Sequence, residues 1–170
     1  EYNQVLAGVN INYRLNASWN SQTSASAKAY DGYESRPFNI LDDASTTANL
    51  KQQLGWENQG LQIKTGVEGS FENYEWSVFE TISGNKGVLE NQFSEDRFFV
   101  NGFVYGLSEI GRNWRLSAAL NLHKLQYSLN DLLVNTTDLS GNYDTPFILS
   151  PGLGINYEVN SSINLFVSLN

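Results

Sequence analysis

The sequence contains no cysteine, no methionine, one histidine and only three prolines in 170 residues. Without cysteine, neither a disulfide framework nor a thiolate metal site is possible. Because methionine is missing even at position 1, we interpret the chain as processed or as a piece of a longer protein. No signal peptide is visible. With a net charge of -8 and no basic run to neutralise phosphates, the chain is not expected to bind nucleic acid.

Long apolar runs are also absent. No stretch reaches the roughly 18 apolar residues that a transmembrane helix needs, and the mean hydropathy is below zero. A transmembrane β-strand needs only about ten residues of alternating character, so this absence leaves a membrane β-barrel open. Aromatic residues make up 13% of the chain, and tyrosine and tryptophan concentrate where hydrocarbon meets water.

Alternation of apolar and polar residues is the main pattern that is present, and it is clearest between positions 114 and 123. One face carries Trp114, Leu116, Ala118, Leu120 and Leu122, and the other carries Arg115, Ser117, Ala119, Asn121 and His123. Because a strand turns successive side chains to opposite faces, this pattern predicts a strand with one apolar and one polar face.

The same alternation predicts an all-β chain of about eight antiparallel strands. The predicted strands run through residues 4–14, 19–30, 46–57, 61–79, 97–107, 114–129, 147–157 and 163–169. Short turns are expected at 15–17, 58–60, 109–113 and 158–161, and longer loops at 31–44, 83–96 and 130–145. Short turns on one side and longer loops on the other are typical of bacterial outer-membrane barrels.

Aromatic residues support this interpretation. Beside the short turns, the apolar face carries Tyr13, Trp56, Trp114 and Tyr157. If these turns are periplasmic, the four rings form the inner interfacial girdle of a barrel. Pattern and girdle together favour a transmembrane wall over the soluble alternative, a sandwich or lipocalin-like barrel whose apolar face packs inward.

Two points stay open at this level. In the strand predicted at 97–107, either Val100, Gly102 and Val104 point outward or Phe99, Phe103 and Tyr105 do. The chain also begins inside one predicted strand and stops inside another. An open sheet edge cannot be satisfied in lipid, so either the first and last strands pair to close a small barrel or the chain is a slice of a larger wall.

The sequence gives no sign of catalysis. His123 is the only histidine, its neighbours Asn121 and Lys124 offer no acid, and no Gly-x-Ser-x-Gly elbow exists. We interpret His123 as a polar residue of the lumen or rim. We therefore expect no enzyme activity, no catalytic residue and no cofactor.

The acidic residues do not form a convincing metal or hydrolase site. Asp42, Asp43, Asp138 and Asp144 match no EF-hand spacing, and we interpret them as solvated loop acids. A second set, Glu68, Glu72, Glu75 and Glu80, does not share one face, so a paired-carboxylate hydrolase is not expected. The sequon at Asn135 would be accidental in a bacterial barrel.

An aromatic group near the ends of the long loops is the best candidate for binding a ligand, through stacking and apolar contact. The candidate ligand-binding residues are Tyr30, Tyr33, Arg36, Phe38, Tyr74 and Trp76. For Tyr30 and Tyr74, an outer interfacial girdle is an equally good interpretation.

Two stretches near the end carry a resemblance to a known family. Leu149 to Tyr157, with the letters LSPGLGINY, and Asn164 to Asn170, with NLFVSLN, resemble the barrel of TonB-dependent outer-membrane receptors, especially those of Bacteroidetes. In that family a strand like Ser-Pro-Arg-Leu-Gly is frequent, and here Gly152 stands in place of the arginine. Residues 29–39 also look like an external loop of this group.

The resemblance implies a transmembrane barrel of 22 strands with an N-terminal plug, of which residues 1–170 would be a partial barrel domain without the plug. It implies an active-transport receptor in the bacterial outer membrane that takes up a scarce nutrient, such as an iron chelate, a glycan or another large solute. The implied partners are outer-membrane lipids, the protein's own plug domain, the TonB energy-transducing complex, the transported solute and a surface lipoprotein. The polar lumen would include Asn10, Asn12, Arg14, Lys64, Glu68, Arg115, Asn121 and Asn156.

Two other functions stay open. One is a complete eight-stranded outer-membrane barrel with a structural or adhesion role, because a barrel of that size is just filled by its own side chains. The other is a soluble β-protein that binds a glycan or a small ligand.

Overall fold

The computed structural model describes residues 1–134 and 137–169, which form a single antiparallel sheet. Its strands are β1 (Tyr2–Arg14), β2 (Trp19–Ser35), β3 (Asn39–Asn58), β4 (Leu61–Ile82), β5 (Asn85–Ile110), β6 (Trp114–Asp131), β7 (Gly141–Asp144), β8 (Ile148–Asn160) and β9 (Ile163–Leu169). The strand order is β1-β2-β3-β4-β5-β6-β8-β9, so each strand from β1 to β6 pairs with the next in sequence. Strand β6 pairs with β8 along its first part and with β7 at its far end. No helix of the described residues is long and apolar enough to cross a membrane.

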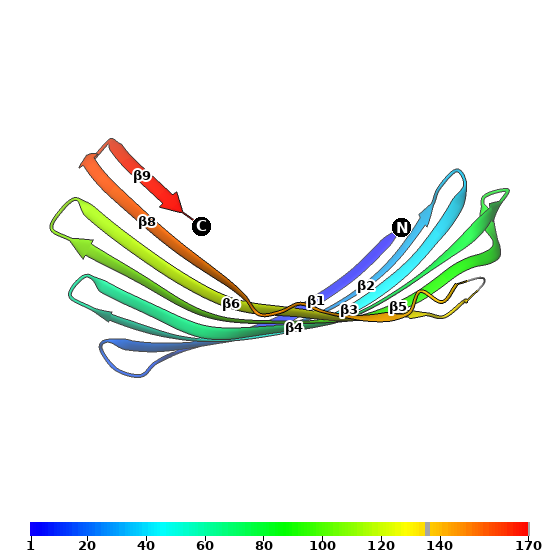
Figure 1. Ribbon diagram of the computed structural model, residues 1–170, viewed down its shortest axis with the longest axis horizontal. Helices are drawn as coiled ribbons and strands as arrows, with labels where there is room; N and C mark the ends of the chain where they lie inside the picture. The colour runs from blue at the N-terminus through cyan, green and yellow to red at the C-terminus, as the bar shows by residue number, and fades with distance from the viewer. Residues whose placement is uncertain (135–136, 170) are drawn as a thin grey trace.

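The sheet is one curved, twisted layer with tight turns at one end and long hairpins at the other (Figure 1). The prediction of an all-β antiparallel wall is confirmed, with β7 as one strand more than expected. In the described part of the chain, β1 and β9 are not paired with each other, so the sheet does not close into an eight-stranded barrel. The alternative of a complete small barrel is therefore wrong for this sheet.

The prediction of long loops at 31–44 and 83–96 is wrong, because most of these residues belong to strands. Strands β2 and β3 stay paired up to Ser35 and Ile40, and β4 and β5 meet at the two-residue turn Ser83-Gly84, where both φ angles are positive. Positive φ at both central residues suits the twist of a hairpin. Polar residues on both faces hid these strands, because backbone pairing continues where apolar alternation stops.

Within the third predicted loop, 130–145, the described residues 132–134 and 137–140 form no strand, and residues 141–144 form β7. The sequon at Asn135 and the last residue of the resemblance, Asn170, lie outside the described residues.

The register settles the facing of β5, because directly paired residues of an antiparallel sheet share a face. Val104 pairs with Leu120, and Gly102 pairs with Leu122. Val100, Gly102 and Val104 therefore lie on the face of Leu120. The aromatic residues Phe99, Phe103 and Tyr105 lie on the opposite, polar face.

One face of the sheet carries a continuous band of apolar residues, which we call the apolar belt. It includes Val5, Val9, Ile11, Ala25, Leu50, Leu54, Ile63, Val67, Val104, Leu116, Leu120, Leu153, Ile155 and Val167. On β4 the belt runs from Leu61 to Phe71. At about 3.3 Å per residue this is about 33 Å along the strand.

The lower edge of the belt reveals how far the strands tilt. Tyr13 of β1 and Trp114 of β6 each mark the bottom of their strand, yet the register aligns Tyr13 with Leu120 through the intervening strands. An offset of six residues over five strand spacings corresponds to a tilt of about 40°. This tilt gives the belt a height of about 25 Å, the thickness of the apolar band of a membrane barrel.

Almost nothing in this sheet is buried. Ile40 is the only buried hydrophobic residue among those described, while Leu50, Val67 and Leu153 are each 58–60% exposed. No second layer covers the belt in the described chain, so the inward-packed sandwich of the soluble alternative is absent. The stability of this sheet therefore comes from backbone pairing and cross-strand side-chain contacts. The apolar belt stays exposed, and an exposed apolar surface of this extent marks a contact with an apolar partner or medium.

Gly66 and Gly102 provide a test of the register. A Cβ atom at Gly66 would meet the backbone carbonyl oxygen of Gln52 and the ring of Phe103, whereas one at Gly102 would have no atom within 4 Å. We expect Gly66→Ala to lower the free energy of unfolding by about 1–3 kcal/mol through overpacking. Gly102→Ala should leave it unchanged or raise it by about 0.5 kcal/mol. Equilibrium urea unfolding measures both, and equal effects would contradict the face assignment.

Candidate ligand-binding wall

The polar face presents a row of hydrogen-bonding side chains halfway along the strands. The register places Asn10, Ser24, Lys51, Glu68 and Asn101 side by side across β1 to β5. Lys51 Nζ lies 3.3 Å from Glu68 Oε2, and Asn101 Nδ2 donates to Glu68 Oε1 at 3.0 Å. A hollow of about 570 Å³ lies over part of this row. All eight residues predicted to be polar lumen residues share this face, as expected.

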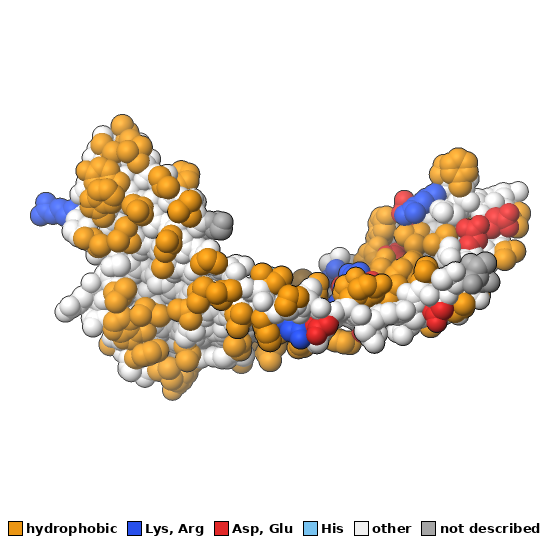
Figure 2. Space-filling model, viewed as in Figure 1, with side chains coloured by type: hydrophobic (Ala, Val, Ile, Leu, Met, Phe, Trp, Pro, Cys, Tyr) orange, Lys and Arg blue, Asp and Glu red, His pale blue; other side chains and the backbone are white. Residues whose placement is uncertain are grey.

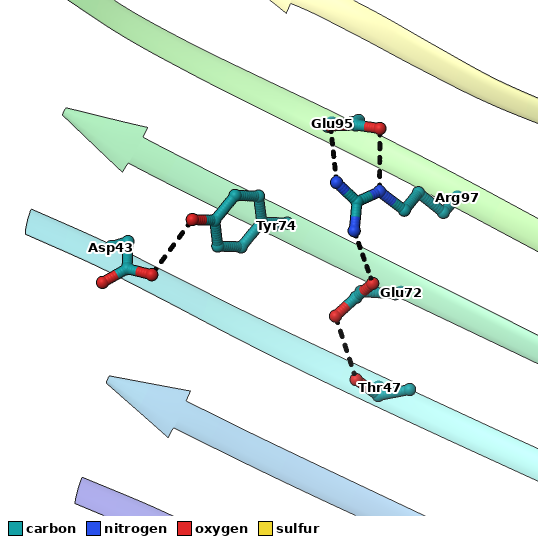
Figure 3. A network of polar contacts seen from close by, with 6 residues as sticks. All are labelled: Asp43, Thr47, Glu72, Tyr74, Glu95 and Arg97. Carbon is teal, nitrogen blue, oxygen red and sulfur yellow. Dashed lines mark hydrogen bonds and ion pairs between the residues drawn. The ribbon is translucent and has the colours of Figure 1, made fainter. Parts of the chain in front are cut away.

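Nearer the long hairpins, a second network ties three strands together (Figure 3). Tyr74 of β4 donates its hydroxyl proton to Asp43 Oδ2 of β3 at 3.0 Å. Gly32 of β2 lies beneath, and a Cβ there would collide with the Tyr30 hydroxyl and with Asp43 Oδ1. Glycine at position 32 therefore makes the space in which Tyr30 and Asp43 approach each other.

Tyr74 is held as a proton donor by its surroundings. Burial, and after it the hydrogen bond to Asp43, raise the pKa of Tyr74 to about 12. The residue lies beyond the belt, which ends at Phe71 on the same strand. The phenol therefore keeps its proton throughout the neutral range, and the carboxylate of Asp43 keeps its donor.

Arg97 of β5 is the centre of the charged part of the network. Its guanidinium donates to both carboxylate oxygens of Glu95 at 2.8 and 2.9 Å and to Glu72 Oε2 at 3.2 Å. The guanidinium carbon also lies 5.5 Å from the centre of the Tyr74 ring, within the range of a cation–π contact. The chain thus holds one guanidinium between two carboxylates and an aromatic ring.

Aromatic rings extend this network along the sheet. Tyr74 stacks on Trp76 with ring centres 5.2 Å apart, and Trp76 stacks on Phe93 at 5.0 Å. On the neighbouring strands Tyr2 stacks on Tyr30 at 6.1 Å. The contact between Trp76 and Phe93 follows from the register, because these two residues pair directly.

The structure separates the predicted ligand-binding residues into three places. Tyr30, Tyr74 and Trp76 come together on the polar face, so the interpretation of Tyr30 and Tyr74 as an outer girdle is wrong. Tyr33 pairs with Asp42 on the opposite face. Binding of a ligand by these residues stays a prediction.

Arg36 and Phe38 lie at the tip of the β2–β3 hairpin, away from the three aromatic residues on the polar face. Arg36 forms an ion pair with Glu34 at 2.7 Å, and this hydrogen bond lowers the pKa of the Glu34 carboxyl. Phe38 is 89% exposed.

The paired acids at 42 and 43 do not form one site. Asp42 lies on the face of Tyr33 and forms an ion pair with Lys86, whose ammonium lies 5.5 Å from the Tyr33 ring centre and 4.7 Å from that of Phe79. Asp43 lies on the other face, with Tyr74. Among the described residues, no group of three or more acids and histidines has a geometry that could hold a metal ion.

Sequence reasoning missed the role of Asp43, Phe93, Glu95 and Arg97 in this network. Glu95 and Arg97 are two residues apart, a spacing that places both side chains on one face of a strand. The sequence pattern predicts a loop at residues 83–96, where a spacing of two residues does not imply a shared face. The spacing indicates a shared face only because residues 85–96 belong to β5. The expectation that Glu68, Glu72, Glu75 and Glu80 do not share a face is confirmed, since Glu75 alone faces away.

No family model matches the sequence, and no curated protein matches it either. Solved structures do match the fold. The chain superposes over 98% of its length on the siderophore receptor PiuA from Acinetobacter baumannii (TM-score 0.78, 11% identity, 32% of that chain). The copper transporter OprC matches over the same share of this chain, with a TM-score of 0.72, 10% identity and 29% of its own chain covered. The ferric citrate transporter FecA matches with a TM-score of 0.69, 14% identity and 27% of its own chain covered. The chain spans about a third or less of these proteins, and its sheet matches a portion of TonB-dependent receptor barrels.

Replacing Arg97 tests whether the network holds the strands together. Glu95 is only 12% exposed at its side chain, so Arg97→Gln leaves a shielded carboxylate without its partner. We expect a loss of about 1–2 kcal/mol in the free energy of unfolding. The control is Arg115→Gln, whose ion pair with Glu109 is more than half exposed on both sides and should contribute less than about 1 kcal/mol. Equal losses in urea unfolding would contradict the prediction.

Proposed function

We propose that this chain is part of the barrel wall of a TonB-dependent receptor, which imports a large, scarce solute across the bacterial outer membrane. The observation that carries the proposal is that the register keeps apolar side chains on one face of the sheet and polar side chains on the other across all the long strands. One face bears an apolar belt of about 25 Å, edged below by Tyr13, Trp56, Trp114 and Tyr157, and the other bears the polar row and the Arg97 network.

The belt is suited to acyl chains. Its leucines and valines are exposed, and a soluble monomer rarely leaves so large an apolar surface uncovered. At the upper edge Phe71 and Phe98 pair with each other on this face and are 48% and 45% exposed. Phe147 is 61% exposed and contacts Lys124, which lies on the same face. Together with the aromatic residues at the lower edge they fit the two girdles of a membrane barrel.

The open edges of the sheet favour a larger barrel. Backbone groups at the outer sides of β1 and β9 need partners, because lipid cannot satisfy them. We propose that residues 1–170 are a partial barrel domain, completed by further strands to about 22 by analogy with the resemblance, and that a plug domain of the same protein occupies the lumen.

The polar face would then line the lumen, and transport would need no covalent chemistry. Solute would be captured at the long-hairpin end and released by rearrangement of the plug, driven by the TonB complex of the inner membrane. A surface lipoprotein is a further candidate partner at the hairpin tips, where Phe38 is exposed.

Placing one charge on each face tests the membrane assignment. Leu120 lies six residues above Trp114, near the middle of the belt, and Asn121 is its neighbour on the polar face. We expect Leu120→Arg to destabilise the folded protein in lipid by about 2–4 kcal/mol. Asn121→Arg adds the same side chain to the polar face and should cost far less. Refolding into lipid vesicles in urea measures both, and a larger cost at position 121 would refute the assignment of the faces.

Dependence on TonB tests the transport function. Cells that carry the full-length protein should take up a limiting nutrient that cells without it do not, and inactivating TonB should abolish this uptake while the protein stays in the outer membrane. Panels of iron chelates, glycans, peptides and cationic solutes serve as the nutrient source. Uptake that persists at the same rate without TonB would rule out a TonB-dependent receptor.

A further inference from the structure

The charges of this chain are strongly segregated along the strands. We define the hairpin end as residues 1–4, 30–46, 72–97 and 124–147, the parts beyond the apolar belt toward the long hairpins. It contains fourteen of the eighteen acidic residues but only four of the ten basic residues. The rest of the chain has four acidic and six basic residues, so the negative charge of the protein lies at one end.

The space-filling view agrees with this division (Figure 2). Hydrophobic side chains cover the end with the tight turns, and acidic and basic side chains gather toward the end with the β2–β3 and β4–β5 hairpins. In the proposed orientation the hairpin end is the mouth of the barrel. A solute therefore meets an excess of carboxylates before it reaches the polar row.

On the polar face of the hairpin end, carboxylates stand among aromatic rings. The acids that the register places on this face are Glu34, Asp43, Glu72, Glu80, Glu95 and Asp131. Arg97 is the basic residue that the register places among them, and Glu72 and Glu95 already neutralise it. The Asp43 carboxylate has tyrosine hydroxyls as neighbours, and Glu80 is exposed.

The chain itself shows that cations are stable on this face. The Arg97 guanidinium lies on the Tyr74 ring between two carboxylates. One row lower, the Lys28 ammonium lies 5.8 Å from the Tyr30 ring centre. Carboxylates supply charge, and ring faces supply the quadrupole that attracts a poorly hydrated cation.

We propose that the polar face at the hairpin end docks a polycationic solute, one that carries several amine or guanidinium groups. This inference rests on the proposed function, because it takes the face as the lumen side of the mouth, and it narrows the transported solute to one charge class. Charge complementarity is the argument: the unpartnered sheet face combines excess carboxylates with aromatic rings. The same field disfavours an anionic iron chelate, which would meet repulsion at the mouth.

Binding of short peptides of opposite charge tests the proposal. The full-length protein, purified from outer membranes in detergent, would be titrated with pentalysine, pentaglutamate and pentaserine, with tryptophan fluorescence as the readout. We expect saturable binding of pentalysine, weakened as the ionic strength rises from about 0.05 to 0.5 M, because salt screens charges at a solvent-accessible mouth. Tighter binding of pentaglutamate or pentaserine than of pentalysine would overturn the proposal.

A matched pair of double variants locates the binding face. Asp43→Asn with Glu80→Gln removes two carboxylates from the polar face, while Asp42→Asn with Glu75→Gln removes two from the opposite face of the same strands. Both variants change the net charge by the same amount. We expect the first to weaken pentalysine binding about fivefold and the second to leave it within about twofold. Equal effects would overturn docking on the polar face.

Folding and membrane insertion are checked separately, so failure of this inference differs from failure of the proposed function. Heat-modifiable gel mobility of each variant reports the folded barrel. If the protein inserts in the outer membrane and its uptake depends on TonB, yet pentalysine does not bind, only the polycationic solute is refuted. If the protein does not insert, the proposed function itself fails.

Discussion

Backbone pairing in register is the constraint on which this structure depends. Each strand from β1 to β6 hydrogen-bonds to the next in sequence, and β6 pairs with both β7 and β8. Because paired residues share a face, one alternating strand sets the facing of the next. The alternation of β6 therefore passes through β5, β4, β3 and β2 to β1 without losing phase. A slip of one residue in any pair would send the apolar belt of every later strand to the polar face.

The same register builds the candidate binding wall from residues far apart in sequence. Asp43, Tyr74 and Arg97 come from three strands. Tyr74 and Arg97 each have one partner two residues away, Trp76 and Glu95, but the bonds from Tyr74 to Asp43 and from Arg97 to Glu72 join different strands. Pairing continues for about ten residues beyond the belt, so the polar face there gains carboxylates and aromatic rings in fixed positions. The charged residues of this region therefore lie on paired strands and not along open loops, and together they create an electrostatic field at one end of the sheet.

Several features were predictable because they are local. Alternation between Trp114 and His123 predicted β6 and its two faces, and the aromatic residues beside the turns predicted the lower edge of the belt. The hairpin ends were not predictable in this way. Beyond Phe71 and Phe98 the apolar face becomes largely polar while aromatic rings stand on the other face, so the period-two hydrophobic pattern loses its phase although strand pairing continues. The predicted binding residues consequently lie in three places, with Tyr33 on the face opposite Tyr30 and Phe38 at a hairpin tip.

The sequence by itself determined that this chain is all-β, that its strands are amphipathic and that its neighbours pair as hairpins, because side-chain period and turn chemistry are properties of a few adjacent residues. Only the tertiary structure decided the facing of β5, the length of the hairpins, the tilt of about 40° and the assembly of the Arg97 network. Each of these depends on which residue of one strand opposes which residue of the next, and that choice is made by the whole sheet at once.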